Sequence, residues 1–204
     1  MRPTTRSVTT WAVCIGSGLV FGLTMTSGST STAAQEVCWT GRHGQFFNAI
    51  HYCVSSVLAP QAGNTYGPEN LASGNAGAAW CEGASGHGIG ESIMIRVEGG
   101  SAFRRLSVGN GYGKSSQTYA SNGRVKTVEL SADTGFTTIV NLADRSDLAT
   151  VNLPALARDW IRVKIVEVYP GRRFADTCMH FLMPDFEYEE ELLLKEQGLL
   201  PKQP

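Results

Sequence analysis

The chain contains few charged residues and no cluster of one sign of charge. Charged residues make up 17% of the 204 residues, against about 25% in a typical soluble domain. The 17 basic and 18 acidic residues nearly balance, and no basic patch stands out. Nucleic acid is therefore excluded as an expected partner.

A long apolar run of membrane-spanning length is also missing. Trp11 to Met25 is uncharged, but it is shorter than the ~20 residues that cross a bilayer and contains three glycines. Arg2 and Arg6 precede it, and Thr32-Ala33-Ala34 follows it with small residues. This order predicts a secretory signal peptide over residues 1–34, with a membrane anchor as the alternative. Cleavage after Ala34 would leave 170 of the 204 residues, with 15 basic and 18 acidic side chains, in a secreted or periplasmic protein.

Cysteine is scarce, but the mature chain would keep an even number. Cys38, Cys53, Cys81 and Cys178 lie beyond residue 34, and an even count in an exported protein favours disulfides. Of the three possible pairings we expect Cys38 with Cys53 and Cys81 with Cys178. The alternative is a zinc site formed by Cys38 and Cys53 together with two histidines, His43 and His51, although the spacing lacks the close Cys-x-x-Cys clustering of structural sites.

Helical periodicity is absent before residue 184, and strand periodicity takes its place. Apolar residues alternate with polar ones in Ser92–Val97 and Val125–Leu130, and Trp160–Tyr169 is the strongest strand. In that strand the apolar positions change parity after Ile165, which predicts a bulge there or burial of both faces. Frequent glycine, 23 residues, and turns such as Asn110-Gly111 predict an all-β protein, a sandwich or jelly roll.

The C-terminal segment, residues 184–204, has a different composition. Acidic residues from Glu187 to Glu191 precede three leucines and Lys195, and Gly198 marks a stop. Acid at the start and base at the end predict a short helix. We expect this acidic tail to pack on the sandwich or fray, with docking to a protein partner as the alternative.

A series of motifs spread along the chain resembles one family. In order, they are Ser55-Ser56-Val57-Leu58, Tyr66-Gly67-Pro68-Glu69-Asn70-Leu71, Ala79-Trp80-Cys81-Glu82-Gly83, Gly88-Ile89-Gly90-Glu91, Asn110-Gly111-Tyr112-Gly113-Lys114, Tyr119, Asn122, Arg124-Val125-Lys126, Val168-Tyr169-Pro170-Gly171 and Asp176-Thr177-Cys178. This pattern resembles the NADase-type glycan-binding domain, a discoidin-like relative of galactose-binding β-sandwiches. The resemblance covers residues 54–183.

The resemblance implies a discoidin-like jelly roll whose loops bind a cell-surface glycan without catalysis and without a cofactor. The expected organisation is then a signal peptide at 1–34, a disulfide-closed segment at 35–53, the sandwich at 54–183 and the tail at 184–204. The chain departs from the family at Ser73–Ala78 and at Met179-His180-Phe181, where related modules carry oxygen ligands for calcium. We therefore expect no metal, since calcium takes six to eight oxygen ligands.

Two sets of side chains are candidates for function. Sugars stack on aromatic rings and hydrogen-bond to amides and cations, which makes the expected glycan-binding set Asn110, Tyr112, Lys114, Tyr119 and Arg124. Tyr112 stands between two glycines and is expected to be exposed. Glu82 and Glu91 would suit a hydrolase as acid and base, but Glu82 after a core tryptophan is expected to tie loop amides together. A structural or protein-interaction module of the envelope is the remaining alternative.

Overall fold

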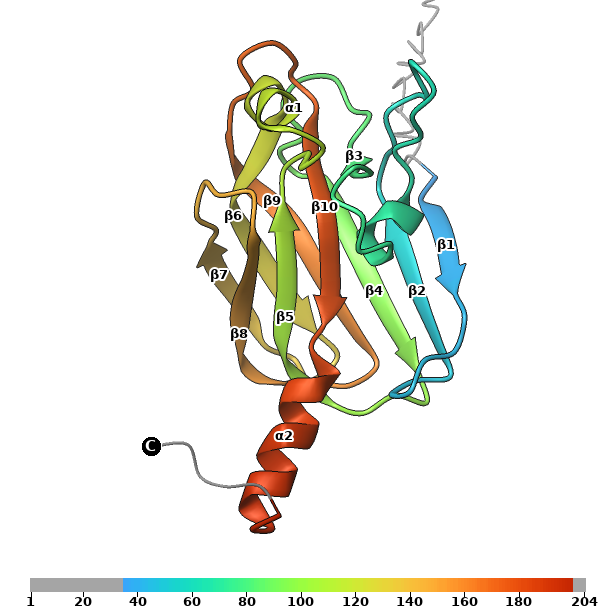
Figure 1. Cartoon of the computed structure of the whole chain (residues 1–204), viewed down its shortest axis with the longest axis vertical. Coiled ribbons are helices and arrows are strands. Elements are labelled where there is room, and N and C mark those ends of the chain that lie inside the picture. The colour runs from blue at the N-terminus through green and yellow to red at the C-terminus, as the bar shows by residue number, and fades with distance from the viewer. Residues whose placement is uncertain (1–34, 200–204) are drawn as a thin grey trace, which may run out of the picture. The chain divides into compact units, whose positions relative to one another are not determined.

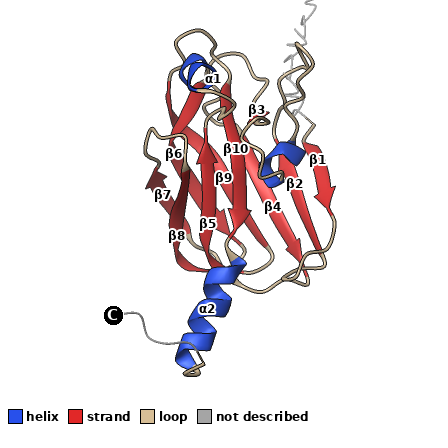
Figure 2. Ribbon diagram, viewed as in Figure 1, coloured by secondary structure: helices blue, strands red, loops and turns tan. Residues whose placement is uncertain are grey.

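The computed structural model describes residues 35–199, and the predicted signal peptide lies outside the described residues. Two layers of strands face each other (Figure 1), the two α-helices lie at the ends of the sandwich, and a short 3-10 helix lies beside β2 (Figure 2). The elements are β1 Val37–Gly41, β2 Ala49–Val54, a 3-10 helix at Pro68–Ala72, β3 Trp80–Cys81, β4 Ser92–Glu98, β5 Phe103–Asn110, α1 Ser116–Ser121, β6 Gly123–Ala132, β7 Thr137–Asn141, β8 Leu148–Ala157, β9 Trp160–Tyr169, β10 Thr177–Pro184 and α2 Phe186–Glu196.

One continuous hydrogen-bonded path connects the two layers. Its order is β1-β2-β4-β9-β6-β10-β5-β8, with β3 paired to β10 and β7 paired to β6. All strand pairs are antiparallel except β6 with β10, a short parallel pairing at Thr177↔Gly123 and Cys178↔Arg124. The path passes from one layer to the other at this short pairing.

The core lies between the layers and follows the alternation seen in the sequence. In β9, Ile161, Val163 and Ile165 are buried, because successive side chains of a strand point to opposite faces. Of the two alternatives predicted for this strand, a bulge or burial of both faces, the structure shows the bulge: Thr127 pairs with Glu167 and Val128 with Ile165, so Val166 has no partner in β6.

The sheet also includes residues that the sequence analysis placed outside the sandwich. β2 pairs with β4 from Ala49↔Glu98 to Val54↔Ile93, and β1 pairs with β2 as an edge hairpin. Tyr52 in β2 is fully buried, and its hydroxyl donates a hydrogen bond to the carbonyl of Leu182 at 2.8 Å. The segment 35–53 is therefore not a separate appendage but one edge of the sheet.

Both α-helices lie at opposite ends of the sandwich (Figure 1). α2 confirms the predicted C-terminal helix: Asp185 caps it by accepting from the Tyr188 amide, and Phe186 packs against Phe103 with ring centroids 5.6 Å apart. The helix α1 was not predicted from the sequence. It is a six-residue helix that begins with a capping box between Ser115 and Thr118. None of the helices within residues 35–199 is long and apolar enough to cross a membrane.

Candidate functional site

Both predicted disulfides are confirmed. Cys81 in β3 lies opposite Cys178 in β10, with Cα atoms 4.1 Å apart, and Cys38 in β1 lies opposite Cys53 in β2 at 4.0 Å. The first bond is buried and the second is partly exposed. Together they indicate an oxidising compartment.

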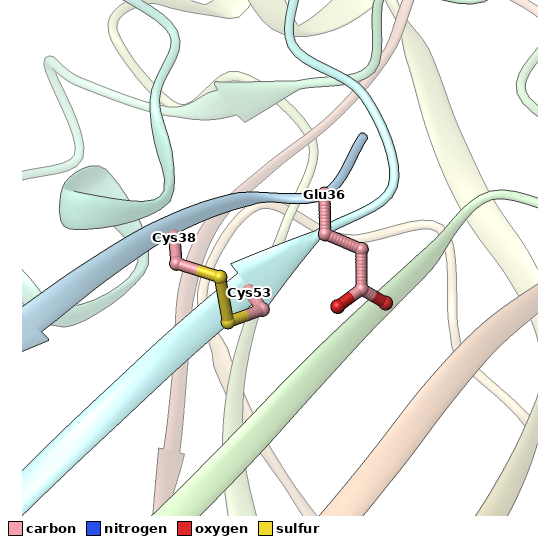
Figure 3. Close-up of side chains that lie close together, drawn as sticks. All are labelled: Glu36, Cys38 and Cys53. Atoms are coloured by element: carbon pink, nitrogen blue, oxygen red, sulfur yellow. A yellow bond between two sulfur atoms is a disulfide. The ribbon is translucent and has the colours of Figure 1, made fainter. Parts of the chain in front are cut away.

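The disulfide at Cys38 and Cys53 excludes the alternative zinc site. Zinc binds thiolates, and these sulfurs are bonded to each other. Glu36 lies near them, with its carboxylate and the two sulfurs within 4.8 Å of one another (Figure 3), but the disulfide leaves no thiolate ligand there. His51, a member of the same alternative set, is instead hydrogen-bonded to Thr40 at 2.8 Å and to Glu98 at 2.9 Å.

Glu82 and Glu91 are both hydrogen-bonded to groups of the surrounding loops. Glu82 is fully buried and accepts hydrogen bonds from the amides of Ala84 at 2.8 Å and Thr177 at 3.0 Å, as predicted. Burial raises the pKa of Glu82, while the two amide donors act in the opposite direction. Glu91 accepts from the hydroxyls of Ser55 and Ser56. Both carboxylates are thus engaged by groups of the surrounding loops.

Arg124, one of the predicted glycan ligands, is saturated by groups of the protein. Its guanidinium donates to both carboxylate oxygens of Asp144, at 3.1 and 2.8 Å. It also donates to the carbonyls of Asn122 at 3.1 Å and Pro170 at 2.9 Å. Hydrogen bonding with Arg124 lowers the pKa of the Asp144 carboxyl. A guanidinium with this set of partners, only 11% exposed in its side chain, has little left to offer a ligand.

Tyr119 and Asn110 also have internal partners. The Tyr119 hydroxyl donates to Asp144 at 2.9 Å, and its ring lies under the Arg124 guanidinium at 5.3 Å. Burial and the neighbouring Asp144 raise the pKa of Tyr119. Asn110 is buried, donates to the carbonyl of Val125 at 2.7 Å and accepts from its amide at 2.9 Å. Arg124, Tyr119 and Asp144, which hydrogen-bond to one another, are called the Arg124 network below, together with Asn110, which is bonded to the main chain of Val125, the residue after Arg124.

The expectation that Tyr112 is exposed is wrong, since only 5% of it is exposed. Gly111 before it adopts a φ of 73°, as the predicted sharp turn requires. That turn directs the ring inward, where it meets Tyr66 edge-on at 6.1 Å. Burial is the main cause that raises the pKa of Tyr112. The glycine neighbours thus permitted the turn but did not decide which way the ring points.

A pocket of about 250 Å³ opens beside Tyr112. Three loops form it: residues 58–66, residues 111–122 with α1, and the β9–β10 loop. The lining side chains are Leu58, Gln61, Ala62, Asn64, Tyr66, Tyr112, Lys114, Thr118, Asn122, Phe174 and Asp176. We call this hollow the loop pocket. α1 and the β9–β10 loop both lie at the end of the sandwich opposite α2 (Figure 1).

The loop pocket combines aromatic surface with polar groups at its mouth. The ring of Phe174 is 43% exposed and lines the pocket. Asn64 accepts from the Lys114 ammonium at 3.1 Å and from the Tyr112 hydroxyl at 3.3 Å. Such weakly held polar groups can exchange their partners for the hydroxyls of a ligand.

The structure brings two of the predicted site residues, Tyr112 and Lys114, into the loop pocket. It places Asn110, Tyr119 and Arg124 in the Arg124 network instead. The sequence analysis missed Asn64, Phe174 and Asp176. Phe174 carried a usable signal, because it is an aromatic residue within the run Gly171-Arg172-Arg173-Phe174 that has no strand alternation.

The sequence matches the family model described as the NAD glycohydrolase translocation F5/8 type C domain over residues 46–183. No curated protein matches the chain significantly.

Among solved structures, similarity is found to the arabinofuranosyltransferase AftD from Mycobacteria, with a TM-score of 0.50 and 15% identity over 72% of this chain and 11% of AftD. The Clostridium perfringens module CpGH89CBM32-5, solved with GalNAc-β-1,3-galactose, has a TM-score of 0.48 and 18% identity over 65% of this chain and 92% of that one. The family 32 carbohydrate-binding module of Streptococcus pneumoniae EndoD has a TM-score of 0.48 and 14% identity, covering 66% of this chain and 94% of the module.

The family model spans more than half of the chain, and the observed two-layered jelly roll agrees with the fold that the sequence motifs implied. The chain therefore belongs to the NAD glycohydrolase translocation F5/8 type C domain family, with a discoidin-like β-sandwich fold.

Proposed function

We propose that this protein is an exported, non-catalytic glycan-binding module that holds its ligand in the loop pocket. The observation that carries the proposal is the pocket itself: an open hollow of about 250 Å³ with an exposed aromatic ring and exchangeable polar groups. A monosaccharide ring presents C–H groups on its faces and hydroxyls on its edge. Phe174 offers a surface for the faces, and Asn64 and Lys114 offer partners for the hydroxyls.

A glycan array with the exported protein is the direct test, followed by affinity measurements on variants. Phe174→Ala removes the exposed ring and is expected to weaken binding about fivefold, because aromatic contacts contribute about 1 kcal/mol. The matched control is Ile139→Ala, which removes an apolar side chain of similar exposure, 56%, from β7 outside the pocket. If Phe174→Ala binds the glycan as tightly as the wild type, the glycan is not held in the loop pocket.

Export is a separate part of this proposal. It is supported by the two disulfides and by the composition of residues 1–34. N-terminal sequencing of protein collected outside the cytoplasm should begin at Gln35. A product that retains Met1 would contradict cleavage at this position.

A second candidate function is protein docking through α2. Leu193 near the end of this helix is 56% exposed, and Leu199 just beyond it is 66% exposed. Exposed leucines on and just beyond a helix that extends from the sandwich (Figure 2) suit a protein contact. Replacement of Leu193 by glutamate should leave glycan binding unchanged and reduce cross-linking to any envelope partner. Cross-linking that is identical in both proteins would count against docking through α2.

A further inference from the structure

The three loops around the loop pocket carry an excess of positive charge. Their charged residues are Lys114, Arg172, Arg173 and Asp176. The whole chain, by contrast, has 17 basic and 18 acidic residues, and the acidic residues of α2 lie at the other end of the sandwich (Figure 1). The cationic groups are therefore concentrated at the end where the pocket opens.

Lys114 is a cation without an acidic partner. It is exposed, and its ammonium contacts only a neutral oxygen, Oδ1 of Asn64 at 3.1 Å. None of the ion pairs formed by residues 35–199 includes Lys114. Lys126, in comparison, is paired with Glu167 at 2.8 Å. An unpaired ammonium at the mouth of a pocket is available for an anionic group of a ligand.

The two arginines of the β9–β10 loop add positive charge at the same end of the sandwich. The amides of Arg172 and Arg173 donate to the carbonyls of Ala120 and Ser121 at 3.0 and 3.1 Å, which fixes the loop against α1. Arg173 places its guanidinium 5.1 Å from the centre of the Phe174 ring, which lines the pocket. Within the described part of the chain, neither arginine forms an ion pair.

From this arrangement we infer that the loop pocket prefers a saccharide with an anionic substituent, a carboxylate or a sulfate ester, and that Lys114 is the residue that recognises this group. The inference rests on the proposed glycan binding. Lys114 and Asp176 are the two charged residues that line the pocket, and Arg172 and Arg173 lie on the loop that carries Asp176. The carboxylate oxygens of Asp176 are suited to accept hydrogen bonds from the sugar hydroxyls. Lysine is a compact point charge that does not select for the planar shape of a carboxylate, so the shared property is the negative charge.

Matched pairs of probes that differ in charge test the inference by calorimetry on the exported protein. The pairs are 3′-sialyllactose with lactose, trigalacturonate with its methyl ester, and galactose 6-sulfate with galactose. We expect the acidic member of at least one pair to bind about tenfold more tightly at low salt, and the ratio to shrink as salt is raised because screening weakens exposed charges. The three pairs separate carboxylates from sulfate esters.

The decisive variant is Lys114→Met, which keeps most of the side-chain length and removes the charge. Its ratio of acidic to neutral affinity should fall towards one. The control Lys164→Met removes an exposed lysine from β9 and should keep the wild-type ratio. Comparable melting temperatures of the two variants would show that both are folded.

The outcomes that overturn the inference are distinct from those that overturn glycan binding. Equal affinities for the acidic and neutral members of every pair would refute the charge preference and leave glycan binding in place. A ratio that persists in Lys114→Met would refute the role of Lys114. Absence of binding to these probes and to a broad glycan array would refute the proposed function, and the inference with it.

Discussion

The loop pocket and the Arg124 network contain the same kinds of residues, but these residues differ in exposure and in the number of their internal hydrogen-bond partners. In the network, Arg124 has four internal acceptors and Asn110 bridges the main chain of β6. In the pocket, Lys114 has one neutral contact and Phe174 is 43% exposed. The difference shows that a polar or aromatic residue near a loop becomes available to a ligand only when the fold leaves its groups unsatisfied.

The largest effect is expected from the disulfide beneath the pocket. Cys81 and Cys178 belong to the same buried cluster as Tyr66 and Tyr112, and their bond closes a loop with a sequence separation of 97. Replacing both cysteines with alanine should lower the free energy of unfolding by about 4–5 kcal/mol, on the chain-entropy model. Urea denaturation measures this loss.

The other disulfide is the matched control. It spans a sequence separation of 15 at the edge hairpin, far from both regions along the sheet. Its removal should cost about 3 kcal/mol on the same model. An equal or greater loss of stability for this pair would contradict the prediction that the bond between Cys81 and Cys178 contributes more to stability.

Tyr112→Ala is expected to give the next largest loss of stability, and it tests whether Tyr112 is a buried structural residue or an exposed residue available to a ligand. The ring is buried against Tyr66, so its removal should destabilise the protein by about 3 kcal/mol, as large-to-small core substitutions do. Tyr112→Phe keeps the ring and loses hydroxyl contacts of only 3.3 and 3.4 Å, so thermal unfolding should change little. If Tyr112→Ala is as stable as the wild type, the ring does not contribute to the core, and the expectation from the sequence that Tyr112 is exposed would be correct.

Arg124→Met breaks the network and is expected to cost about 2 kcal/mol, because hydrogen bonds to charged groups contribute about 1.5–3 kcal/mol. Glycan affinity should not change, since Arg124 does not line the pocket. Arg145→Met is the control, because Arg145 forms an exposed pair with Asp147 and such pairs contribute little. A loss of glycan binding in Arg124→Met without a loss of stability would reverse the assignment of the two regions.

The network should also make stability sensitive to acid. Arg124 holds the pKa of Asp144 below its usual value of 3.8, so the stabilisation that ionised Asp144 provides is fully present above about pH 4. It is lost as the pH falls from there through the lower pKa of the folded state. In Arg124→Met this part of the acid dependence should disappear, which denaturant titrations between pH 5 and 2 would show.

The smallest effect is expected from calcium. Ser73 and Asn75 close their own loop: the Ser73 hydroxyl donates to the carbonyl of Asn70 at 3.0 Å, and Oδ1 of Asn75 accepts from the Gly77 amide at 2.9 Å. Since Ala78 and Phe181 offer no side-chain oxygen, neither added calcium nor a chelator should move the melting temperature. A substantial rise with calcium would show that the loop next to Tyr112 binds the ion after all.

Prediction from the sequence worked best where a local pattern of residues was compatible with only one secondary structure. Alternation in Trp160–Tyr169 located β9 and its bulge, and the acidic start before the leucines located α2. It failed at α1, since six residues are too few for a helical period. It also missed the strand at Ala49–Val54, although Ile50, Tyr52 and Val54 alternate there.

The sequence by itself indicated an all-β protein, disulfides among its four later cysteines and the bonding of Glu82 to loop amides. Strand periodicity, an even cysteine count and a glutamate next to a core tryptophan carried these inferences, and the family motifs carried the discoidin-like fold. The tertiary structure alone decided which of the polar and aromatic loop residues are open to a ligand. Tyr112 and Phe174 are both aromatic loop residues, yet one is 5% and the other 43% exposed. Their exposure depends on loops contributed by distant parts of the chain, residues 58–66 against Tyr112 and α1 against the β9–β10 loop, and no local pattern records these contacts.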